Sequence, residues 1–233
     1  MANQLDLEEQ EQLDQLKHFW KQYGNAITWV LIVVLGAYAS WNTYQYWQRR
    51  QATQAAALFD EFERTLLAAD ATKDATKIDR VFADMKNRFG STAYAQQAGL
   101  LVAKQYAATN KLDKAQAALT WVADHSSDTG YQAVARLRLS AVLAESKNFE
   151  GALAQLAGSF PDSFQALVAD RRADILLLQG KQSEAVTEYK KAYRLLETNN
   201  EYRHLVDVKL NALGVDAQAP NAVTTATEKN QKL

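Results

Sequence analysis

The chain has 233 residues, a formal net charge of −1 and no cysteine. The lack of cysteine excludes disulfides, thiolate metal sites and a cysteine nucleophile. The neutral charge balance argues against nucleic acid as a partner, because phosphate binding needs clustered positive charge. With only two prolines and abundant helix-forming residues, the composition predicts an all-α fold.

Residues 1–24 are predicted to form a short acidic head. Leu13, Leu16 and Trp20 recur at helical spacing, which indicates a short amphipathic helix. One interpretation is a docking surface on the near side of a membrane. The simpler alternative, a solvated acidic lead-in to the next segment, is the one the charge pattern favours.

Residues 25–47 are predicted to form a transmembrane helix. No charged residue occurs between Lys21 and Arg49, and a helix of this length would rise roughly 33 Å, enough to cross the hydrocarbon core of a bilayer. A cleaved signal peptide is the alternative, because Ala37-Tyr38-Ala39 matches a small-residue cleavage pattern. The long acidic region before this segment and the tryptophans and tyrosines at its two ends favour an uncleaved anchor.

The charges that flank this helix do not set its direction. Two lysines, Lys17 and Lys21, precede it, and two arginines, Arg49 and Arg50, follow it. The positive-inside rule compares these numbers, so charge alone leaves the orientation open.

Gly36 and Ser40 form a small-xxx-small pair inside the helix. Such a pair lets a second helix approach closely, which predicts a membrane helix-packing face. Small residues are also common in transmembrane helices for no specific reason, and this alternative stays open.

Residues 51–213 are predicted to form an array of helical hairpins similar to tetratricopeptide repeats (TPRs). Helices over residues 51–69 and 77–89 make the first hairpin. Three further hairpins share a register in which a polar turn ends at Ala115, Ala152 or Ala185, with spacings of 37 and 33 residues. The tetratricopeptide period is about 34 residues.

The same register assigns small and bulky side chains to packing positions between helices. Small residues are expected at Ala103, Ser140 and Ala173. Bulky residues are expected at Tyr106, Leu143, Leu176, Leu119, Leu156 and Tyr189. The middle unit is the weakest match, because Gly158 and Pro161 end its second helix early. A helix over residues 201–213 is predicted to cap the array, and residues 214–233 are predicted to be a disordered tail.

The sequence contains no pattern of residues that predicts catalysis. Glu201 and His204 have the spacing of a helical metal-ligand pair, but the chain lacks the second copy that such a site needs. No glycine-rich phosphate loop or nucleophile elbow occurs. We therefore expect a protein that is not an enzyme, with no catalytic, cofactor-binding or metal-binding residues.

The remaining candidate site is the concave face of the array, where the first helices of the hairpins would form a partly apolar groove for a partner helix or an unfolded segment. The alternative is that a small shift of register places these leucines in the core. The candidate groove residues are Leu100, Lys104, Val134, Leu137, Asp170, Asp174 and Leu177.

The order of these segments resembles that of the ancillary SecYEG translocon subunits, the YfgM-like tetratricopeptide proteins of Gram-negative bacteria. The resemblance covers about residues 8–213. It is carried by Leu16-Lys17-His18-Phe19-Trp20, Trp41-x-x-Tyr44-x-x-Trp47, Arg136-Leu137-Arg138-Leu139, Ala169-Asp170-Arg171-Arg172-Ala173 and Lys209-Leu210-Asn211-Ala212-Leu213.

The resemblance implies a single-pass protein of the bacterial inner membrane, with a cytoplasmic head and a periplasmic array. It implies a place beside SecYEG, together with the membrane-anchored periplasmic chaperone PpiD, where emerging polypeptides pass to periplasmic chaperones. It also implies a link between the head and a response regulator of the Rcs envelope-stress system, and no cofactor. The alternative is a membrane-tethered scaffold that organises another envelope complex or a complex facing the cytoplasm.

Overall fold

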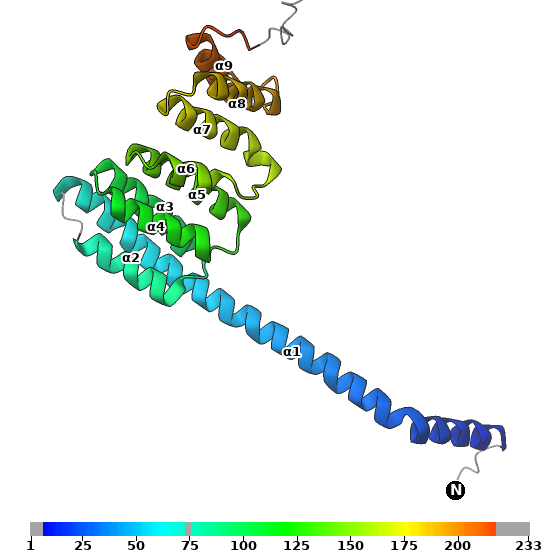
Figure 1. Ribbon diagram of the computed structural model, residues 1–233. Coiled ribbons are helices and arrows are strands. Elements are labelled where there is room, and N and C mark those ends of the chain that lie inside the picture. Colours follow the sequence, from blue (N-terminus) through cyan, green and yellow to red (C-terminus); the bar gives the residue numbers. More distant parts are fainter. Residues whose placement is uncertain (1–6, 73–75, 218–233) are drawn as a thin grey trace, which may run out of the picture. The chain divides into compact units, whose positions relative to one another are not determined.

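The computed structural model describes residues 7–72 and 76–217, and every regular element in this part of the chain is helical (Figure 1). The all-α fold is therefore confirmed. The helices are α1 (Leu7–Thr72), α2 (Thr76–Phe89), α3 (Ala93–Ala108), α4 (Leu112–His125), α5 (Thr129–Glu145), α6 (Phe149–Leu156), the 3-10 turn η1 (Asp162–Phe164), α7 (Gln165–Leu178), α8 (Gln182–Leu195) and α9 (Glu201–Ala212).

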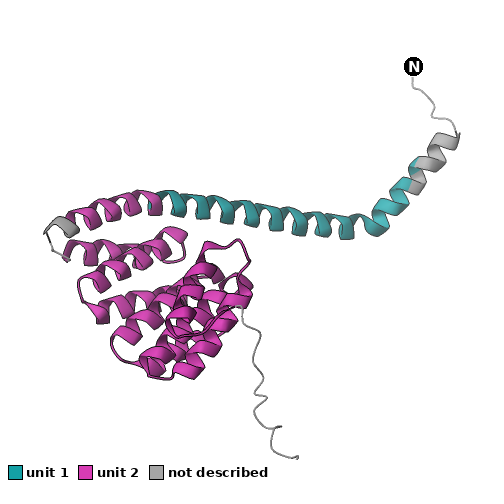
Figure 2. Ribbon diagram, turned by 90° about the horizontal axis from the view of Figure 1, so that it is seen from above, with its two compact units in different colours: residues 1–54 teal, residues 55–233 magenta. Residues whose placement is uncertain are grey.

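The chain divides into two compact units, Met1–Gln54 and Ala55–Leu233 (Figure 2). Helix α1 contributes to both. The sequence predicts separate helical segments for the head, the crossing and the first repeat, whereas the structure joins them in one helix. No proline interrupts this stretch, and its two glycines, Gly24 and Gly36, are tolerated inside a helix at a cost of about 1 kcal/mol each.

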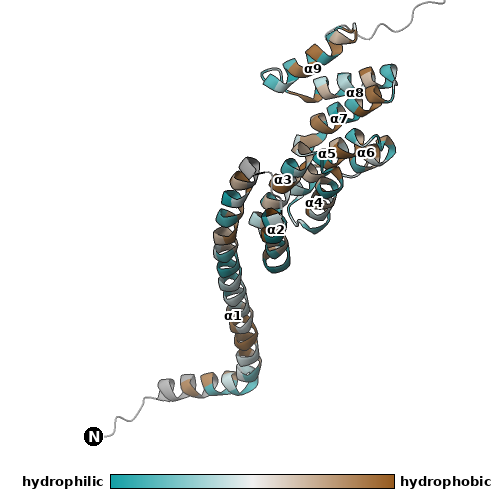
Figure 3. Cartoon of the chain, turned by 90° about the vertical axis from the view of Figure 1, so that its left-hand side faces the viewer, coloured by the Kyte–Doolittle hydropathy of each residue, from teal (hydrophilic) through white to brown (hydrophobic). Residues whose placement is uncertain are grey.

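The first unit carries the candidate membrane span. Among the described residues, one helix is long and apolar enough to cross a membrane, and its candidate stretch starts at Leu16. Large apolar side chains on this helix are exposed, with fractions of 63 % for Trp29, 65 % for Val33 and 63 % for Leu35. Figure 3 shows hydrophobic residues along α1. A core helix of a soluble protein would bury such side chains, so their exposure fits a surface that faces lipid or another helix.

The turns of the second unit confirm the predicted repeat register. Asn110, Lys147 and Gly180 have φ of 57°, 62° and 76°, respectively, and each lies five residues before its repeat alanine. Such a left-handed residue closes the end of a helix. In each turn the next N–H donates to a carbonyl five residues back, for example Lys111 to Tyr106 at 2.8 Å.

The predicted packing positions are also buried. The repeat alanines Ala115, Ala152 and Ala185 are each 0 % exposed. The exposed fractions of the other small and bulky packing residues are Ala103 2 %, Ser140 0 %, Ala173 0 %, Tyr106 5 %, Leu143 5 %, Leu176 7 %, Leu119 1 %, Leu156 1 % and Tyr189 2 %. The fold of the second unit is therefore the predicted TPR-like array, and its middle unit is short because α6 ends at Leu156.

Two hydrophobic cores lie along this array. The first is built from α1 to α6 with Val168 and Ile175 of α7, and the second from α7, α8 and α9. Leu153 of α6 packs against both cores. Arg172 of α7 links them by a hydrogen bond from its Nη2 to the carbonyl of Leu156 at 3.0 Å.

Helix α9 caps the array as predicted, with Val206 and Leu210 fully buried. The predicted tail begins differently from expectation, because Val215 and Ala217 pack against the second core. The rest of the predicted tail, residues 218–233, lies outside the described residues. So do the first six residues of the predicted head.

Candidate binding face of the array

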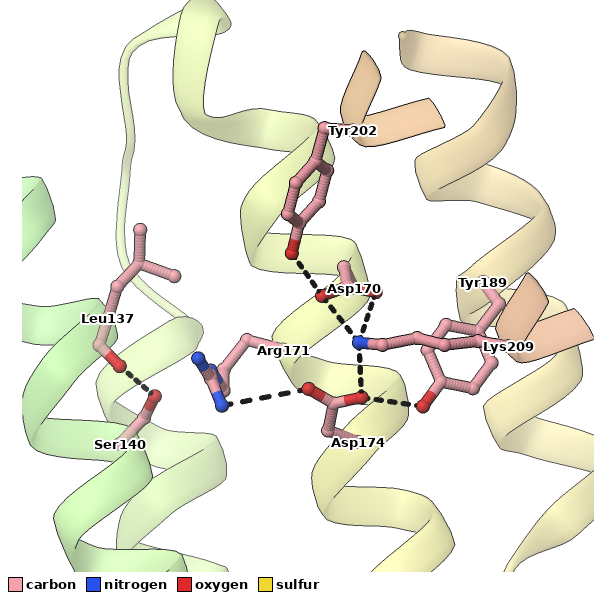
Figure 4. Close-up of polar contacts among 8 residues, drawn as sticks. All are labelled: Leu137, Ser140, Asp170, Arg171, Asp174, Tyr189, Tyr202 and Lys209. Atoms are coloured by element: carbon pink, nitrogen blue, oxygen red, sulfur yellow. Dashed lines mark hydrogen bonds and ion pairs between the residues drawn. The ribbon is translucent and has the colours of Figure 1, made fainter. Parts of the chain in front are cut away.

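A buried carboxylate joins α7 to the capping helix (Figure 4). Asp170 is 2 % exposed. Its two oxygens accept hydrogen bonds from Lys209 Nζ at 2.8 and 2.9 Å, and Oδ2 also accepts one from the Tyr202 hydroxyl at 2.6 Å. A buried carboxylate requires this kind of pairing, so the α7–α9 contact depends on Lys209.

Asp174, one turn further along α7, shares the same ammonium group. Its Oδ1 accepts hydrogen bonds from Lys209 Nζ at 2.7 Å and from the Tyr189 hydroxyl of α8 at 2.6 Å. The ammonium also lies 5.2 Å from the centre of the Tyr189 ring. An aspartate on α7, a tyrosine on α8 and a lysine on α9 thus connect three successive helices.

The same three residue types connect α2, α3 and α4. The Tyr106 hydroxyl of α3 donates to Asp79 Oδ1 of α2, and Lys114 Nζ of α4 donates to Asp79 Oδ2 at 2.6 Å. The Lys114 ammonium lies 5.5 Å from the centre of the Tyr106 ring. We call these two groups, Asp79–Tyr106–Lys114 and Asp174–Tyr189–Lys209, the Asp–Tyr–Lys clamps.

The clamps perturb the protonation of their members. Burial raises the pKa of Tyr106, Tyr189 and Tyr202 above the usual tyrosine range, and the hydrogen bond that each phenol donates to an aspartate raises it further. Burial also tends to raise the pKa of Asp79, but the hydrogen bonds from Lys114 and Tyr106 outweigh it and lower the pKa below its usual value. All four shifts favour the protonation states found at neutral pH.

The predicted groove residues fall into two groups. Lys104 is exposed, Leu177 is 38 % exposed, and Val134 and Leu137 are half-buried against the first core. Leu100, in contrast, is 8 % exposed and belongs to the core. From the sequence, these leucines could belong either to the groove or to the core. The packing of the helices places Leu100 in the core.

The two predicted aspartates are engaged in contacts within the array. Both oxygens of Asp170 and Oδ1 of Asp174 accept hydrogen bonds from Lys209 and from tyrosine hydroxyls, and a role of either residue in binding a ligand stays a prediction. The sequence predicted both aspartates on the face of the array but did not predict their partners Lys209 and Tyr202. A repeat pattern does not indicate which residues of a capping helix contact that face.

Arg138 and Arg171 are further residues that the sequence reasoning missed. Arg138 donates from Nη1 to the Leu100 carbonyl of α3 at 3.2 Å. Arg171 points from α7 towards α5, with Nη1 3.6 Å from Asp174 Oδ2 (Figure 4). The sequence does indicate that the two arginines occupy equivalent repeat positions, because each lies fourteen residues before its repeat alanine, Ala152 or Ala185.

Gly36 and Ser40 are both exposed on α1. A side-chain carbon added at Gly36 would meet nothing within 4 Å. The predicted helix-packing face is therefore open in the single chain, and its use by a second helix stays a prediction.

The described residues give no sign of metal chemistry, since they contain no group of three or more His, Asp or Glu that could hold an ion. His204, which has the spacing of a metal-ligand pair with Glu201, is exposed on α9. His125 stacks on the Trp121 ring, and its Nδ1 lies 3.0 Å from the Trp121 carbonyl.

Comparison with known proteins decides the family. A family model described as a tetratricopeptide repeat-like domain matches residues 17–215. An ancillary SecYEG translocon subunit of Haemophilus influenzae is 30 % identical over 186 residues, which cover 80 % of this chain and 89 % of the relative. The chain belongs to the ancillary SecYEG translocon subunit family.

Other members of the family align over nearly their whole length. Proteins of the same name are 28 % identical over 207 residues in Neisseria gonorrhoeae (89 % of this chain, 98 % of the relative) and 26 % identical over 209 residues in Escherichia coli (89 % and 97 %). The name describes a translocon-associated subunit and no class of enzyme. No solved structure is significantly similar to the chain. The resemblance seen in the sequence is thus confirmed.

Proposed function

We propose that this protein is a non-enzymatic, membrane-anchored adaptor that sits beside the SecYEG translocon and receives emerging polypeptides on its TPR-like array. The observation that carries the proposal is the combination, in one chain, of an exposed apolar helix and a helical-repeat array, in a family whose relatives are named translocon subunits. A tether of this kind holds a binding surface at high local concentration beside its membrane partner.

In this proposal, the array hands its clients to periplasmic chaperones, and the membrane-anchored periplasmic chaperone PpiD is its partner at the translocon. The proposal includes a cytoplasmic head that regulates a response regulator of the Rcs system. The array then faces the periplasm of the bacterial inner membrane. The partly apolar face that includes Val134, Leu137 and Leu177 supports the client-binding part, because unfolded chains expose apolar side chains.

In-cell photo-crosslinking tests the partners. A photoreactive amino acid at Gly36 or Ser40 is expected to capture a translocon subunit, and one at Leu137 or Leu177 is expected to capture PpiD or translocating chains. A matched probe at Lys191 on α8, which is exposed on a different helix, provides the control. Capture of none of these partners at the first four positions would refute the proposal.

Protease treatment tests the orientation. Intact spheroplasts expose the periplasmic face of the inner membrane, so protease is expected to degrade the array and leave the head. A protected array would place it in the cytoplasm, as expected for a scaffold of a complex facing the cytoplasm. An accessible array that crosslinks only to other envelope proteins would point to a periplasmic scaffold instead.

A further inference from the structure

Three cationic side chains lie on successive first helices of the hairpins. They are Lys104 on α3, Arg138 on α5 and Arg171 on α7, and we call them the basic row. Helix α3 contacts α5, and α5 contacts α7. Arg138 reaches the Leu100 carbonyl, one turn from Lys104, and Arg171 points towards α5 (Figure 4).

The charges of the basic row are poorly compensated within the described chain. Lys104 is exposed and makes no hydrogen bond or ion pair there. Arg138 donates only to a backbone carbonyl. Arg171 is 3.6 Å from Asp174 Oδ2, beyond good hydrogen-bond length, and its Nε has no hydrogen-bond partner among the described atoms.

The nearby carboxylates are partly neutralised. Lys209 binds both Asp170 and Asp174, which leaves one negative charge beside Arg171, whose Nη1 is 3.6 Å from Asp174 Oδ2. Among the described residues, Lys104 and Arg138 have no carboxylate partner, and besides these two aspartates the one acidic residue of α3, α5 and α7 is Glu145 at the end of α5. The face therefore presents two uncompensated cations next to a partly compensated third, Arg171.

The helices that carry these charges also carry partly open apolar side chains. Leu101, Val134 and Leu137 are half-buried, so part of each side chain remains open, and Leu177 is 38 % exposed. A ligand complementary to this face would bring both carboxylates and apolar groups. A phosphate ion or a lipid headgroup supplies only the charge, whereas a polypeptide segment supplies both.

We propose that the basic row selects acidic, apolar polypeptide segments, with Lys104, Arg138 and Arg171 pairing with Asp or Glu side chains of the segment while its apolar side chains contact Leu137 and Leu177. This inference rests on the proposed client-binding role of the array and names the chemistry of the client. Selection by charge would act mainly on capture rate and specificity.

The test uses the full-length chain in zwitterionic nanodiscs and fluorescent peptides in which leucine alternates with Glu, Gln or Lys. Anisotropy titrations at low salt are expected to show that the Glu peptide binds at least about tenfold tighter than the Lys peptide, with the Gln peptide between them. Raising the salt concentration should reduce this difference, because salt screens exposed charges.

Charge reversal then assigns the effect to the basic row. The double variant Lys104→Glu, Arg138→Glu is expected to bind the Glu peptide about tenfold more weakly and the Lys peptide more tightly than the natural chain does. Lys191→Glu on α8 introduces the same kind of charge change elsewhere and should alter neither affinity. Equal melting temperatures of the variants exclude unfolding, and a gain of Lys-peptide binding cannot arise from damage to the fold.

The possible failures are distinguishable. If the three peptides bind equally, or reversal leaves the preference unchanged, the acidic selectivity is refuted while the proposed client-binding role stands. If no peptide binds, both are refuted, although crosslinking to the translocon would still be tested on its own. If anionic lipid vesicles bind through Lys104 and Arg138 and the Glu peptide does not, the basic row is a lipid site and the proposal is wrong.

Discussion

The ammonium of Lys209 on α9 lies 2.7 Å from the carboxylate of Asp174 on α7, although 35 residues separate them in the chain. The same ammonium binds the buried Asp170. One lysine therefore binds two carboxylates on successive turns of α7, and α9 is fixed to the array by charge as well as by its buried Val206 and Leu210.

Replacing Lys209 should destabilise the array strongly. The change Lys209→Met keeps the apolar stem of the side chain but leaves Asp170 buried beside Asp174 without a positive partner. We expect the free energy of unfolding to fall by about 3 kcal/mol, the usual loss when one member of a buried ion pair is removed. Urea unfolding followed by circular dichroism measures it. Lys191→Met, at an exposed position of α8, should change stability by no more than about 0.5 kcal/mol.

Alkaline pH should weaken the array through its buried phenols. Burial and the hydrogen bond to Asp170 raise the pKa of Tyr202 above its unfolded value of about 10. The stability that this phenol contributes is complete below pH 10 and is lost as pH rises towards the folded pKa. Tyr202→Phe should therefore lose less stability than the natural chain between about pH 9 and pH 11. Unfolding curves of both proteins across this pH range measure the difference. Equal losses of stability in the two proteins would contradict the assignment of the effect to Tyr202.

Acid should remove the contribution of the first clamp. Despite burial, hydrogen bonds from Lys114 and Tyr106 lower the pKa of Asp79 below its unfolded value of about 3.9. Its contribution is present above that pH and is lost as pH falls through the folded pKa. Asp79→Asn should thus be less stable than the natural chain at neutral pH, and the gap should shrink below about pH 4. A gap that is independent of pH would show that the carboxylate charge does not matter.

Gly99 sets how closely α3 and α4 approach. A side-chain carbon at this position would lie 2.5 Å from Cγ2 of Val122, which is fully buried. Gly99→Ala should therefore cost about 1–3 kcal/mol of stability by overpacking. The double variant Gly99→Ala, Val122→Ala should lose less than the sum of the two single changes, because the second change removes the clash. Additive losses in thermal unfolding would contradict this explanation.

The fold could be predicted from sequence because its determinants are local and repeat. The alanines at 115, 152 and 185 and the left-handed residues five positions before them define each hairpin without knowledge of the rest. The exposed, uncharged stretch of α1 was equally clear. The continuity of α1 was missed, since helical segments of different character gave no reason to expect one helix, and so was the packing of Val215 and Ala217 against the second core.

The binding face could be predicted only in part. The repeat register located the first helices correctly, yet it could not show that Leu100 faces the core, because one position along a helix turns a side chain by about 100°. Nor could it show that Asp170 meets Lys209, since that contact joins residues 39 apart. Long-range polar contacts depend on how the capping helix folds back, and no local pattern encodes this.

Helix α6 is eight residues long and buries only Ala152 and Leu156, whereas α4 is fourteen residues long and buries five side chains. The two cores meet at this short helix, and neither Asp–Tyr–Lys clamp spans it. A pull along the array would therefore load a joint that is held by Leu153, which packs against both cores, and by the hydrogen bond from Arg172 to the Leu156 carbonyl. We expect mechanical compliance at this joint, between two blocks that each carry a clamp.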